Sequence, residues 1–371
     1  MIIGILKEIK SDENRVSMTP AGVELFTQFG HRVLVEEGAG FGSGLSDAAY
    51  QSAGARIVGT AQEIYAKAEM IMHVKEPLPS EYSLIRPNQI MFTYLHLAAN
   101  RELTEALLQS GSVCIAYETI QAADGSLPLL KPMSEVAGRM AIQQGAKYLE
   151  MEFGGNGTLL GGVPGVDPGT IVVIGGGTVG KNAAKIACGM GAKVYVLDND
   201  LERMRYLSDI MPKNCFLLMS TPATVRELLP EADVIVGAVL IPGAKAPKVV
   251  KREMLHLINK GSVMVDVSID QGGCFETSRP TTHNDPIYIV DGVVHYCVSN
   301  MPGAVARTST MALTNATLPY ALDIATKGWK TACLENPEIR SGLNIVEGRV
   351  TCRGVAEAFS KTYTPVDEFL A

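Results

Sequence analysis

Short apolar runs alternate with amphipathic stretches along the first third of the chain. Continuous apolar runs predict buried strands, whereas apolar residues at intervals of three or four predict helices. In this part they predict strands at 2–6, 31–37, 68–74, 89–95 and 112–117, and helices after Pro20, around 47–53 and at 100–110. Because predicted strands and helices alternate, we expect a doubly wound parallel sheet.

A second alternation of strands and helices begins in the middle of the chain. The apolar run 171–174 is followed by a glycine turn, an amphipathic helix and a second apolar run that ends at Asp198. Ser134 is expected to cap a long helix over 134–151, and another long helix is expected over 304–325. Further strands are predicted at 232–240, 261–270 and 296–301. The predicted fold class is α/β, with two Rossmann-like parallel sheets joined by long helices.

The glycine turn has the spacing G-x-G-x-x-G. Gly175 allows a tight turn, Gly177 lets the backbone approach a pyrophosphate, and Gly180 lets the helix pack closely on the strand. The helix N-terminus then faces the anion. Asp198 lies where a carboxylate accepts hydrogen bonds from an adenosine ribose, and its charge disfavours a 2′-phosphate. Glycines alone also fit a structural turn, but the full order of strand, turn, helix, strand and acid predicts a dinucleotide site that prefers NAD to NADP.

The remaining stretches carry weaker patterns. The glycine-rich stretch 153–169 lacks the spacing of a phosphate loop, so we expect turns there. The segment after residue 325 is expected to be helical or irregular and to pack on the first domain. We therefore place a discontinuous substrate domain at 1–128 and 306–371 and an NAD-binding domain at 129–305, with the active site in the cleft between them.

Composition narrows the classes of protein. A length of 371 residues suggests two domains, and 47% hydrophobic with 19% charged residues is typical of a globular protein. The formal net charge is −7 and no basic cluster is present, so nucleic acid is not expected as a partner. Seven cysteines without a C-x-x-C pair argue for reduced thiols and against a zinc site. With no apparent signal peptide or membrane-spanning stretch, we expect a cytoplasmic protein without a membrane partner.

Three residues that follow different predicted strands of the first domain form a candidate site. Ligands bind at the carboxyl ends of parallel strands, and Arg15, Lys75 and His96 each lie past such an end. Each also has a plain alternative: a solvated surface charge for Arg15 and Lys75, and an ordinary loop histidine for His96. Together they suit a carboxylate, a carbonyl oxygen and proton transfer near neutral pH. His73 lies inside a predicted strand and is expected to be a packed histidine.

Strand ends in the second domain supply further candidates. Val239 and Leu240 end one predicted strand and should approach the nucleotide. Asp270 ends another strand just before Gly272 and Gly273. An acid at this place fits a helix cap, a surface charge or a catalytic group, and the spacing does not decide among them.

Long and specific motifs resemble one family over essentially the whole chain. They are GILKEIKSDENRVSMTP at the start, HVKEP around Lys75, FTYLHLA around His96, KPMSEVAGRM around Ser134, VIGGGTVGKNAA, DVSIDQGG around Asp270, and VSNMPGAVARTST. In these motifs the chain resembles the L-alanine dehydrogenase family. The NAD-binding part of proton-translocating nicotinamide nucleotide transhydrogenase belongs to the same family.

The resemblance implies functions for individual residues. It implies substrate contacts at Arg15 and Lys75 and acid–base residues at His96 and Asp270. We expect no metal ligands among the site residues. Cofactor contacts are implied at Ser134, Thr178, Val179, Asp198, Arg203, Ser220, Val239, Leu240, Val267, Ser268, Ile269, Asp270, Arg279, Val298, Ser299, Asn300 and Met301. Arg203 beside the ribose acid also suits a 2′-phosphate, which weakens the preference for NAD.

The implied reaction is the reversible oxidative deamination of L-alanine by NAD to pyruvate and ammonium, and the resemblance also implies a homohexamer. Either His96 or Asp270 suits the activation of water; we favour His96 at the oxygen and Asp270 near the nitrogen. The alternatives are a lysine or saccharopine dehydrogenase, a transhydrogenase subunit, or a regulatory nucleotide-binding protein. A transhydrogenase should continue toward a membrane domain. A regulatory protein would not explain why the substrate and acid–base residues occur together.

Overall fold

The computed structural model describes residues 1–239 and 246–370. It separates the chain into two compact units, called here unit 1 (Met1–Met133 and Val305–Ala371) and unit 2 (Ser134–Ala304). Each unit has its own sheet and its own hydrophobic core. The domain boundaries predicted from the sequence are 128/129 and 305/306, and the functional labels of the two domains stay predictions.

Unit 1 is built around a mainly parallel sheet, whose strand order in the described residues is β15-β14-β6-β5-β4-β1-β2-β3. The strands are β1 (Ile2–Ile5), β2 (Arg32–Glu36), β3 (Arg56–Val58), β4 (Met70–Met72), β5 (Ile90–Thr93), β6 (Val113–Ala116), β14 (Leu343–Val346) and β15 (Arg349–Val350). Strands β1 to β6 are parallel to their neighbours in this group. Because parallel strands end at the same edge, the residues that follow them lie close together.

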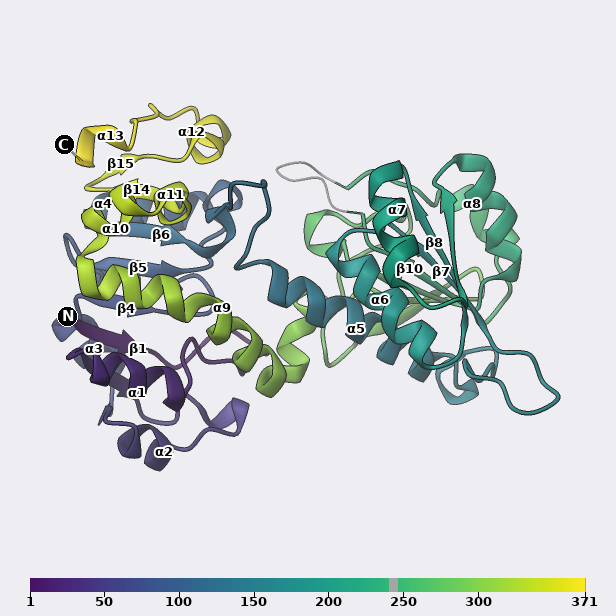
Figure 1. The fold of residues 1–371 in the computed structure, drawn as a ribbon, viewed down its shortest axis with the longest axis horizontal. Coiled ribbons are helices and arrows are strands. Elements are labelled where there is room, and N and C mark those ends of the chain that lie inside the picture. Colours follow the sequence, from purple (N-terminus) through teal and green to yellow (C-terminus); the bar gives the residue numbers. More distant parts are fainter. Residues whose placement is uncertain (240–245, 371) are drawn as a thin grey trace. The chain divides into compact units, whose positions relative to one another are not determined.

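Helices pack around this sheet (Figure 1). They are α1 (Pro20–Gln28), α2 (Asp47–Ser52), α3 (Ala61–Lys67), α4 (Arg101–Ser110), α9 (Ala306–Lys327), α10 (Trp329–Glu335), α11 (Pro337–Ser341), α12 (Arg353–Phe359) and α13 (Asp367–Leu370). The side chains of Thr19, Thr60 and Asn100 cap α1, α3 and α4 by accepting hydrogen bonds from first-turn N–H groups. Helix α9 lies beside α1 and α10 (Figure 1).

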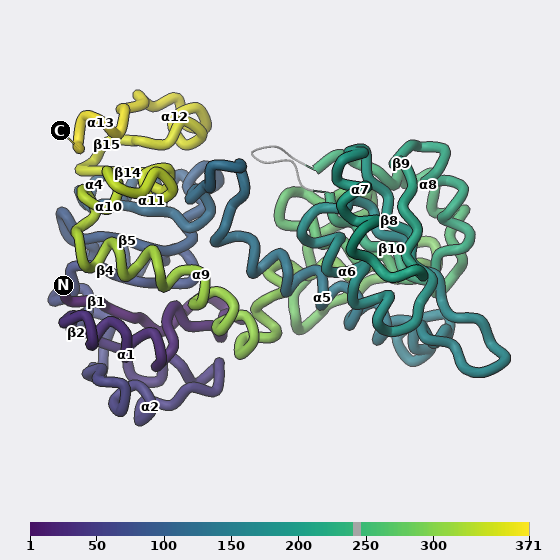
Figure 2. Tube along the Cα trace, in the orientation of Figure 1, coloured from purple at the N-terminus to yellow at the C-terminus, as the bar shows by residue number. Residues whose placement is uncertain are grey.

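The segment after α9 returns to the sheet of unit 1. The expectation that it is helical or irregular is wrong for β14 and β15: β14 pairs antiparallel with β6, and β15 pairs with β14. These strands are short, and polar Asn344 and Arg349 interrupt their apolar residues, so no continuous apolar run reveals them. Figure 2 shows both chain ends within the same unit.

Unit 2 contains the second sheet, with the order β12-β13-β11-β10-β7-β8-β9 in the described residues. Its strands are β7 (Thr170–Ile174), β8 (Lys193–Asp198), β9 (Cys215–Met219), β10 (Val234–Gly237), β11 (Val263–Asp266), β12 (Ile287–Val290) and β13 (Val293–Tyr296). Its helices are α5 (Lys131–Tyr148), which begins in unit 1, α6 (Thr178–Gly189), α7 (Leu201–Ile210) and α8 (Pro222–Leu228). Only β12 pairs antiparallel among these strands. The prediction of two Rossmann-like parallel sheets is confirmed.

The structure corrects several predicted element ends in unit 2. Helix α5 begins at Lys131, so Ser134 is not its cap; Pro132 fits the first helical turn, where its missing N–H is not needed. The strand predicted at 261–270 ends at Asp266. The strand predicted at 296–301 lies earlier in the chain, as β13. It forms a hairpin with β12 that turns at Asp291 and Gly292, both of which have positive φ.

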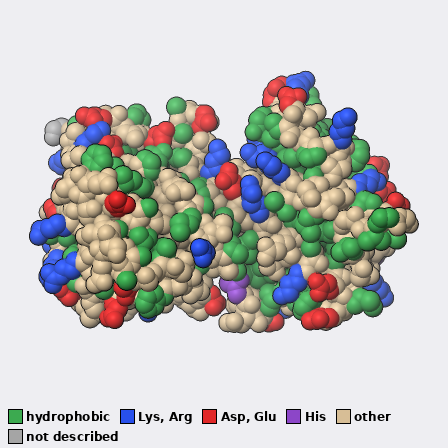
Figure 3. Space-filling model, turned by 60° about the horizontal axis from the view of Figure 1, so that its bottom comes forward, with side chains coloured by type: hydrophobic (Ala, Val, Ile, Leu, Met, Phe, Trp, Pro, Cys, Tyr) green, Lys and Arg blue, Asp and Glu red, His purple; other side chains and the backbone are tan. Residues whose placement is uncertain are grey.

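The surface carries both signs of charge on the face drawn in Figure 3, among exposed hydrophobic side chains. The most exposed large hydrophobic residues include Met151 and, on the glycine-rich stretch before β7, Leu159 and Val166. That stretch contains an isolated bridge between Val163 and Val166. In the part of the chain that the structure describes, no helix combines the length and hydropathy needed to cross a membrane.

Candidate active site

Arg15 lies on the loop between β1 and α1 and is almost fully buried. Its Nε and Nη2 donate to the Glu13 carboxylate at 2.6 and 2.5 Å, and its Nη1 lies 3.1 Å from the Met133 sulfur. Burial opposes the charged form, but the hydrogen bond and the charge of Glu13 outweigh burial and raise the pKa of Arg15. The guanidinium is therefore a fixed positive charge.

Lys75 follows β4, and a buried carboxylate holds its backbone. The two Glu8 carboxylate oxygens accept the N–H groups of Val74 and Lys75 at 2.6 and 3.3 Å. The Thr93 hydroxyl, at the end of β5, donates to the Lys75 carbonyl at 2.9 Å. Burial, and then the positive charge of Arg15, lower the pKa of Lys75. Arg15 and Lys75 follow β1 and β4, which are parallel neighbours that end at the same edge of the sheet.

His96 lies just past β5 in a left-handed backbone conformation, with φ 49° and ψ 36°. This conformation costs about 1–2 kcal/mol for a residue with a Cβ atom, so surrounding contacts must hold it. The imidazole stacks on the Tyr94 ring, with centroids 5.9 Å apart and planes at 9°. Tyr94 in turn contributes to the raised pKa of Arg15. The structure therefore brings Arg15, Lys75 and His96 into one part of unit 1, while their functions stay predictions.

His73 is buried as expected, but it follows β4 and binds two carboxylates. Its Nδ1 lies 3.0 Å from Glu8 Oε1, and its Nε2 lies 3.2 Å from Glu81 Oε1. Burial lowers the pKa of His73, but the two glutamates outweigh burial and raise it to about 10. The interpretation of His73 as an ordinary packed histidine is therefore incomplete, because the residue is a buried imidazolium.

Sequence reasoning missed the carboxylates that hold these residues in place. Glu8 and Glu13 lie in the polar stretch after β1, and Glu118 lies in the turn after β6. A usable signal exists, because each acid lies near the carboxyl end of a predicted parallel strand. Hydrogen bonds between strand ends depend on the strand order, which the sequence does not specify.

The glycine turn of unit 2 has the geometry of an anion site. Gly175 has φ 104°, and a Cβ at Gly180 would lie 1.7 Å from the Gly175 oxygen, so α6 packs directly on the turn. The space around Gly177 is open: a Cβ added there would have no heavy atom of the described residues within 4 Å, apart from the adjacent backbone. Gly177 gives α6 no side-chain cap, so first-turn N–H groups remain for an anion. The turn therefore fits a pyrophosphate.

Asp198, Arg203 and Ser220 lie together beside this turn. The Asp198 carboxylate accepts the N–H groups of Gly176 at 2.6 Å and Asp200 at 2.8 Å. Arg203 Nε donates to the Gly176 carbonyl at 2.6 Å, and the Ser220 N–H donates to the Asp198 carbonyl at 2.8 Å. A dinucleotide with its pyrophosphate at the turn would have its ribose next to this group.

Asp270 is exposed and belongs to a 3₁₀ turn (Ile269–Gln271) rather than to the end of a strand. Its Oδ2 lies 3.4 Å from the Asn300 backbone nitrogen, which links two predicted cofactor segments. The turn is anchored by the buried Asp266, which accepts the N–H groups of Ser268 at 3.0 Å and Cys274 at 2.9 Å. Asp270 is thus a carboxylate on a well-anchored turn.

The remaining predicted cofactor residues lie in three parts of unit 2. Ser134 lies in the first turns of α5, and Thr178 and Val179 begin α6. The Ser268 hydroxyl donates to the Val239 carbonyl at 2.7 Å, which joins Val239 to the segment of Val267, Ser268 and Ile269. The third part holds Arg279 and the run Val298, Ser299, Asn300 and Met301; the Ser299 N–H donates to Thr281 at 3.2 Å. Leu240 lies outside the described residues.

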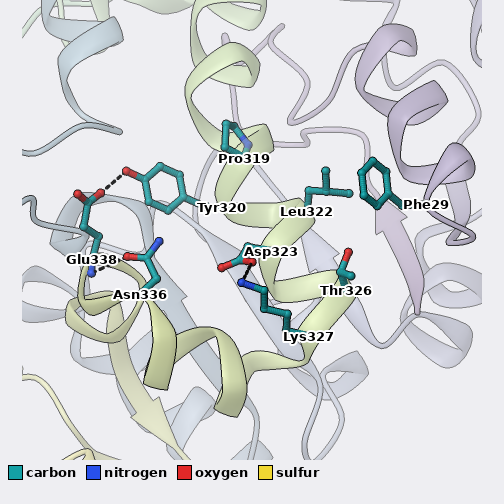
Figure 4. A pocket seen from close by; sticks show the side chains of 9 residues that line it. All are labelled: Phe29, Pro319, Tyr320, Leu322, Asp323, Thr326, Lys327, Asn336 and Glu338. Carbon is teal, nitrogen blue, oxygen red and sulfur yellow. Dashed lines mark hydrogen bonds and ion pairs between the residues drawn. The ribbon is translucent and has the colours of Figure 1, made fainter.

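Figure 4 shows a pocket in unit 1 of about 600 Å³ between Phe29, helix α9 and the start of α11. Its polar side chains largely bind one another: Tyr320 donates to Glu338, and Lys327 pairs with Asp323 at 2.6 Å. Its lining contains no residue that the sequence predicts to bind substrate or cofactor. Among the described residues, no group of three His, Cys, Asp or Glu side chains is arranged to hold a metal ion.

Comparison with known proteins places this arrangement in a family. The description "Alanine dehydrogenase/PNT, N-terminal domain" matches residues 4–137, and "Alanine dehydrogenase/PNT, C-terminal domain" matches residues 141–353. The chain belongs to the alanine dehydrogenase/PNT family. The resemblance found in the sequence motifs is thereby confirmed.

Several relatives are similar over their full length. The chain is 57% identical to an alanine dehydrogenase of Methanococcus maripaludis, over 100% of both chains. It is 53% identical to an alanine dehydrogenase of Bacillus subtilis, over 100% of this chain and 98% of the relative. A solved L-alanine dehydrogenase matches with a TM-score of 0.95 and 48% identity, covering 97% of this chain and 99% of that one. A transhydrogenase from Sinorhizobium meliloti shares the fold, with a TM-score of 0.83, 23% identity, and 94% and 100% coverage.

Proposed function

We propose that the chain is an NAD-dependent L-alanine dehydrogenase. It converts L-alanine, NAD⁺ and water reversibly to pyruvate, ammonium, NADH and a proton. The observation that carries this proposal is that Arg15, Lys75 and His96 follow the neighbouring parallel strands β1, β4 and β5 of unit 1, whose carboxyl ends lie at one edge of the sheet. The full-length similarity to alanine dehydrogenases supports the same substrate.

Arg15 and Lys75 bind the polar groups of the substrate. The Arg15 guanidinium, oriented by Glu13, suits the carboxylate that alanine and pyruvate share. The Lys75 ammonium suits the carbonyl oxygen of pyruvate, and its lowered pKa lets it donate a hydrogen bond more readily than an ordinary lysine. Binding both groups fixes the orientation of Cα.

His96 and Asp270 move protons. Once the α-amino group of alanine has lost a proton, loss of a hydride from Cα leaves an iminium carbon that water attacks, and a base must take a proton from that water. We assign His96 to the oxygen and Asp270 to the nitrogen, which leaves as ammonia and is protonated. Either residue has the chemistry for either step, so the assignment rests on the position of His96 in the same unit as Arg15 and Lys75.

NAD supplies the hydride acceptor when it is bound. Gly175, Gly177 and Gly180 would hold the pyrophosphate at the start of α6, and Asp198 would bind the ribose. Val239, Ser268 and the segment 298–301 would line the nicotinamide half. Leu240 is proposed with them from the resemblance alone.

The deciding experiment compares substrates. NADH formation is measured with alanine, glutamate, lysine and saccharopine, and with 2-hydroxy acids such as lactate. Alanine should be the best substrate, because the unit 1 site offers one carboxylate clamp and we identify no second clamp among the described residues. Comparable turnover with lysine or saccharopine would contradict the proposal, and turnover only with 2-hydroxy acids would contradict the amine chemistry.

We also propose a cytoplasmic homohexamer. The cysteines of the described residues are all free thiols, which supports a reducing compartment. Support for the hexamer comes from the family resemblance. Light scattering coupled to size-exclusion chromatography tests it, and a mass of one or two chains at micromolar concentration would contradict it.

A further inference from the structure

The turn that carries His96 is closed by a carboxylate from the neighbouring strand. Glu118 Oε1 accepts the His96 N–H at 2.6 Å. The Leu95 N–H lies 3.1 Å from Oε1 and 3.2 Å from Oε2 of the same carboxylate. Both oxygens of Glu118 are thus directed at the backbone immediately before the imidazole.

The sheet places this carboxylate there. Strands β5 and β6 are parallel neighbours, with Thr93 opposite Ala116, so the residues that follow each strand meet at one edge. Glu118 is half-buried in the turn after β6. Two successive N–H groups converging on one anion resemble a backbone nest, here filled by a side chain of the same unit. Hydrogen bonds to a carboxylate are also stronger than neutral ones.

His96 needs such a holder because of its backbone. Its φ of 49° is a conformation that residues with a Cβ rarely adopt. A change to the right-handed region would redirect the Cα–Cβ bond and move the imidazole. Tyr94 supports the ring from one side, and its hydroxyl is fixed to the Leu129 carbonyl at 2.5 Å. Stacking on the Tyr94 ring does not by itself hold the His96 backbone in the left-handed conformation.

We propose that Glu118 is a positioning residue that acts through His96, by holding the left-handed turn that aims the imidazole at the substrate. This inference rests on the proposed function, which assigns proton transfer to His96. Glu118 need not touch substrate or cofactor. Its contribution should therefore disappear when the imidazole is absent.

The test is a double-mutant cycle on the full-length protein. Glu118→Ala, Glu118→Gln, His96→Ala and the double variants are compared with Glu102→Ala, which removes an exposed carboxylate from the first turn of α4. Turnover and the Michaelis constant are measured with saturating ammonium and NADH, NADH affinity is measured by fluorescence titration, and melting temperatures are recorded. The cycle distinguishes an effect of Glu118 that requires the His96 imidazole from an effect that is independent of it.

Glu118→Ala should lower turnover about tenfold to a hundredfold, the scale for a misplaced catalytic group, with unchanged NADH affinity. Glu118→Gln should lose less, because its amide oxygen still accepts the His96 N–H. In the His96→Ala background neither change should lower turnover further. Glu102→Ala should retain normal turnover.

Two outcomes would overturn this inference and leave the proposed function untouched. They are normal turnover in Glu118→Ala, or an equal loss of turnover with and without the His96 imidazole. If the alanine variant does not fold, the same comparison with Glu118→Gln decides, and equal losses in both backgrounds again overturn it. Normal turnover in His96→Ala would instead refute the proposed function of His96, and the inference with it.

Discussion

The Asp198 carboxylate accepts the backbone N–H of Gly176 at 2.6 Å. The carbonyl of the same glycine accepts a hydrogen bond from Arg203 Nε at 2.6 Å, so side chains hold both backbone polar groups of one residue in the turn. The acid proposed to bind the ribose therefore also orders the backbone proposed to bind the pyrophosphate. A substitution at Asp198 should change both ends of the cofactor site.

We expect Asp198→Ala to weaken NAD binding and to reduce the discrimination against NADP by about 1–3 kcal/mol, the scale of a lost hydrogen bond to a charged group. Asp198→Asn is the matched control, since it keeps an acceptor for Gly176 and removes only the charge. Isothermal titration with both cofactors measures the two affinities. Unchanged discrimination in both variants would show that the acid does not face the ribose.

Loss of either proposed acid–base group should affect turnover more than affinity. His96→Ala and Asp270→Asn should each lower the maximal rate at least about a hundredfold, the low end for such a group. NAD binding should be largely preserved, because the glycine turn and Asp198 remain. Steady-state kinetics in both directions tests this, and near-normal turnover at saturating substrate would remove the residue from the mechanism.

Arg15→Ala should behave as a binding variant. It removes the proposed partner of the carboxylate, so the Michaelis constants for alanine and pyruvate should both rise, by about tenfold or more for a lost charged hydrogen bond. It also removes the guanidinium that pairs with the buried Glu13 carboxylate, which should lower the melting temperature. Glu13→Gln with Arg15→Ala is the control, since it removes the buried negative charge as well. Recovery of stability without recovery of substrate affinity is the expected result.

The buried imidazolium of His73 predicts a stability that declines toward alkaline pH. The folded pKa is raised to about 10, above the ordinary value near 6.5, because Glu8 and Glu81 outweigh the effect of burial. The stabilisation is therefore fully present below about pH 6.5 and is lost as pH rises through about 10. Urea unfolding midpoints at several pH values measure this.

His73→Gln should be less stable at neutral pH and should show a flatter alkaline decline. Tyr65 also faces this group through Glu81, with its hydroxyl 3.1 Å from Glu81 Oε1. Tyr65→Phe removes an uncharged partner of Glu81, and its alkaline decline is therefore compared with that of His73→Gln. His256→Gln, on the surface, is the control. An equal alkaline decline with and without His73 would contradict its charged state.

The sequence predicts those parts of the fold that depend on continuous patterns. The apolar run before Gly175 and the acid at the end of β8 identify the nucleotide unit without reference to distant residues. By contrast, β14 contains Asn344, and its pairing with β6 is visible only in the folded sheet. Long-range pairing of short strands carries little local signal.

The same distinction applies to the site. Arg15, Lys75 and His96 follow apolar runs, so their positions near a sheet edge follow from the pattern. Which acid holds which residue does not follow, because Glu8 and Glu118 reach across to other strands. The charge of His73 was missed for this reason: its two glutamate partners come from other segments of unit 1.

The antiparallel strand at the edge of β6 has a consequence for synthesis on the ribosome. Residues Leu343–Val346 emerge only after all of unit 2 has been translated, so until then the nascent chain presents β6 as an unprotected sheet edge. Such an edge can pair with another nascent chain. Completion of unit 1 is therefore a late event, and the period before it is when a stalled or truncated chain is most prone to aggregate.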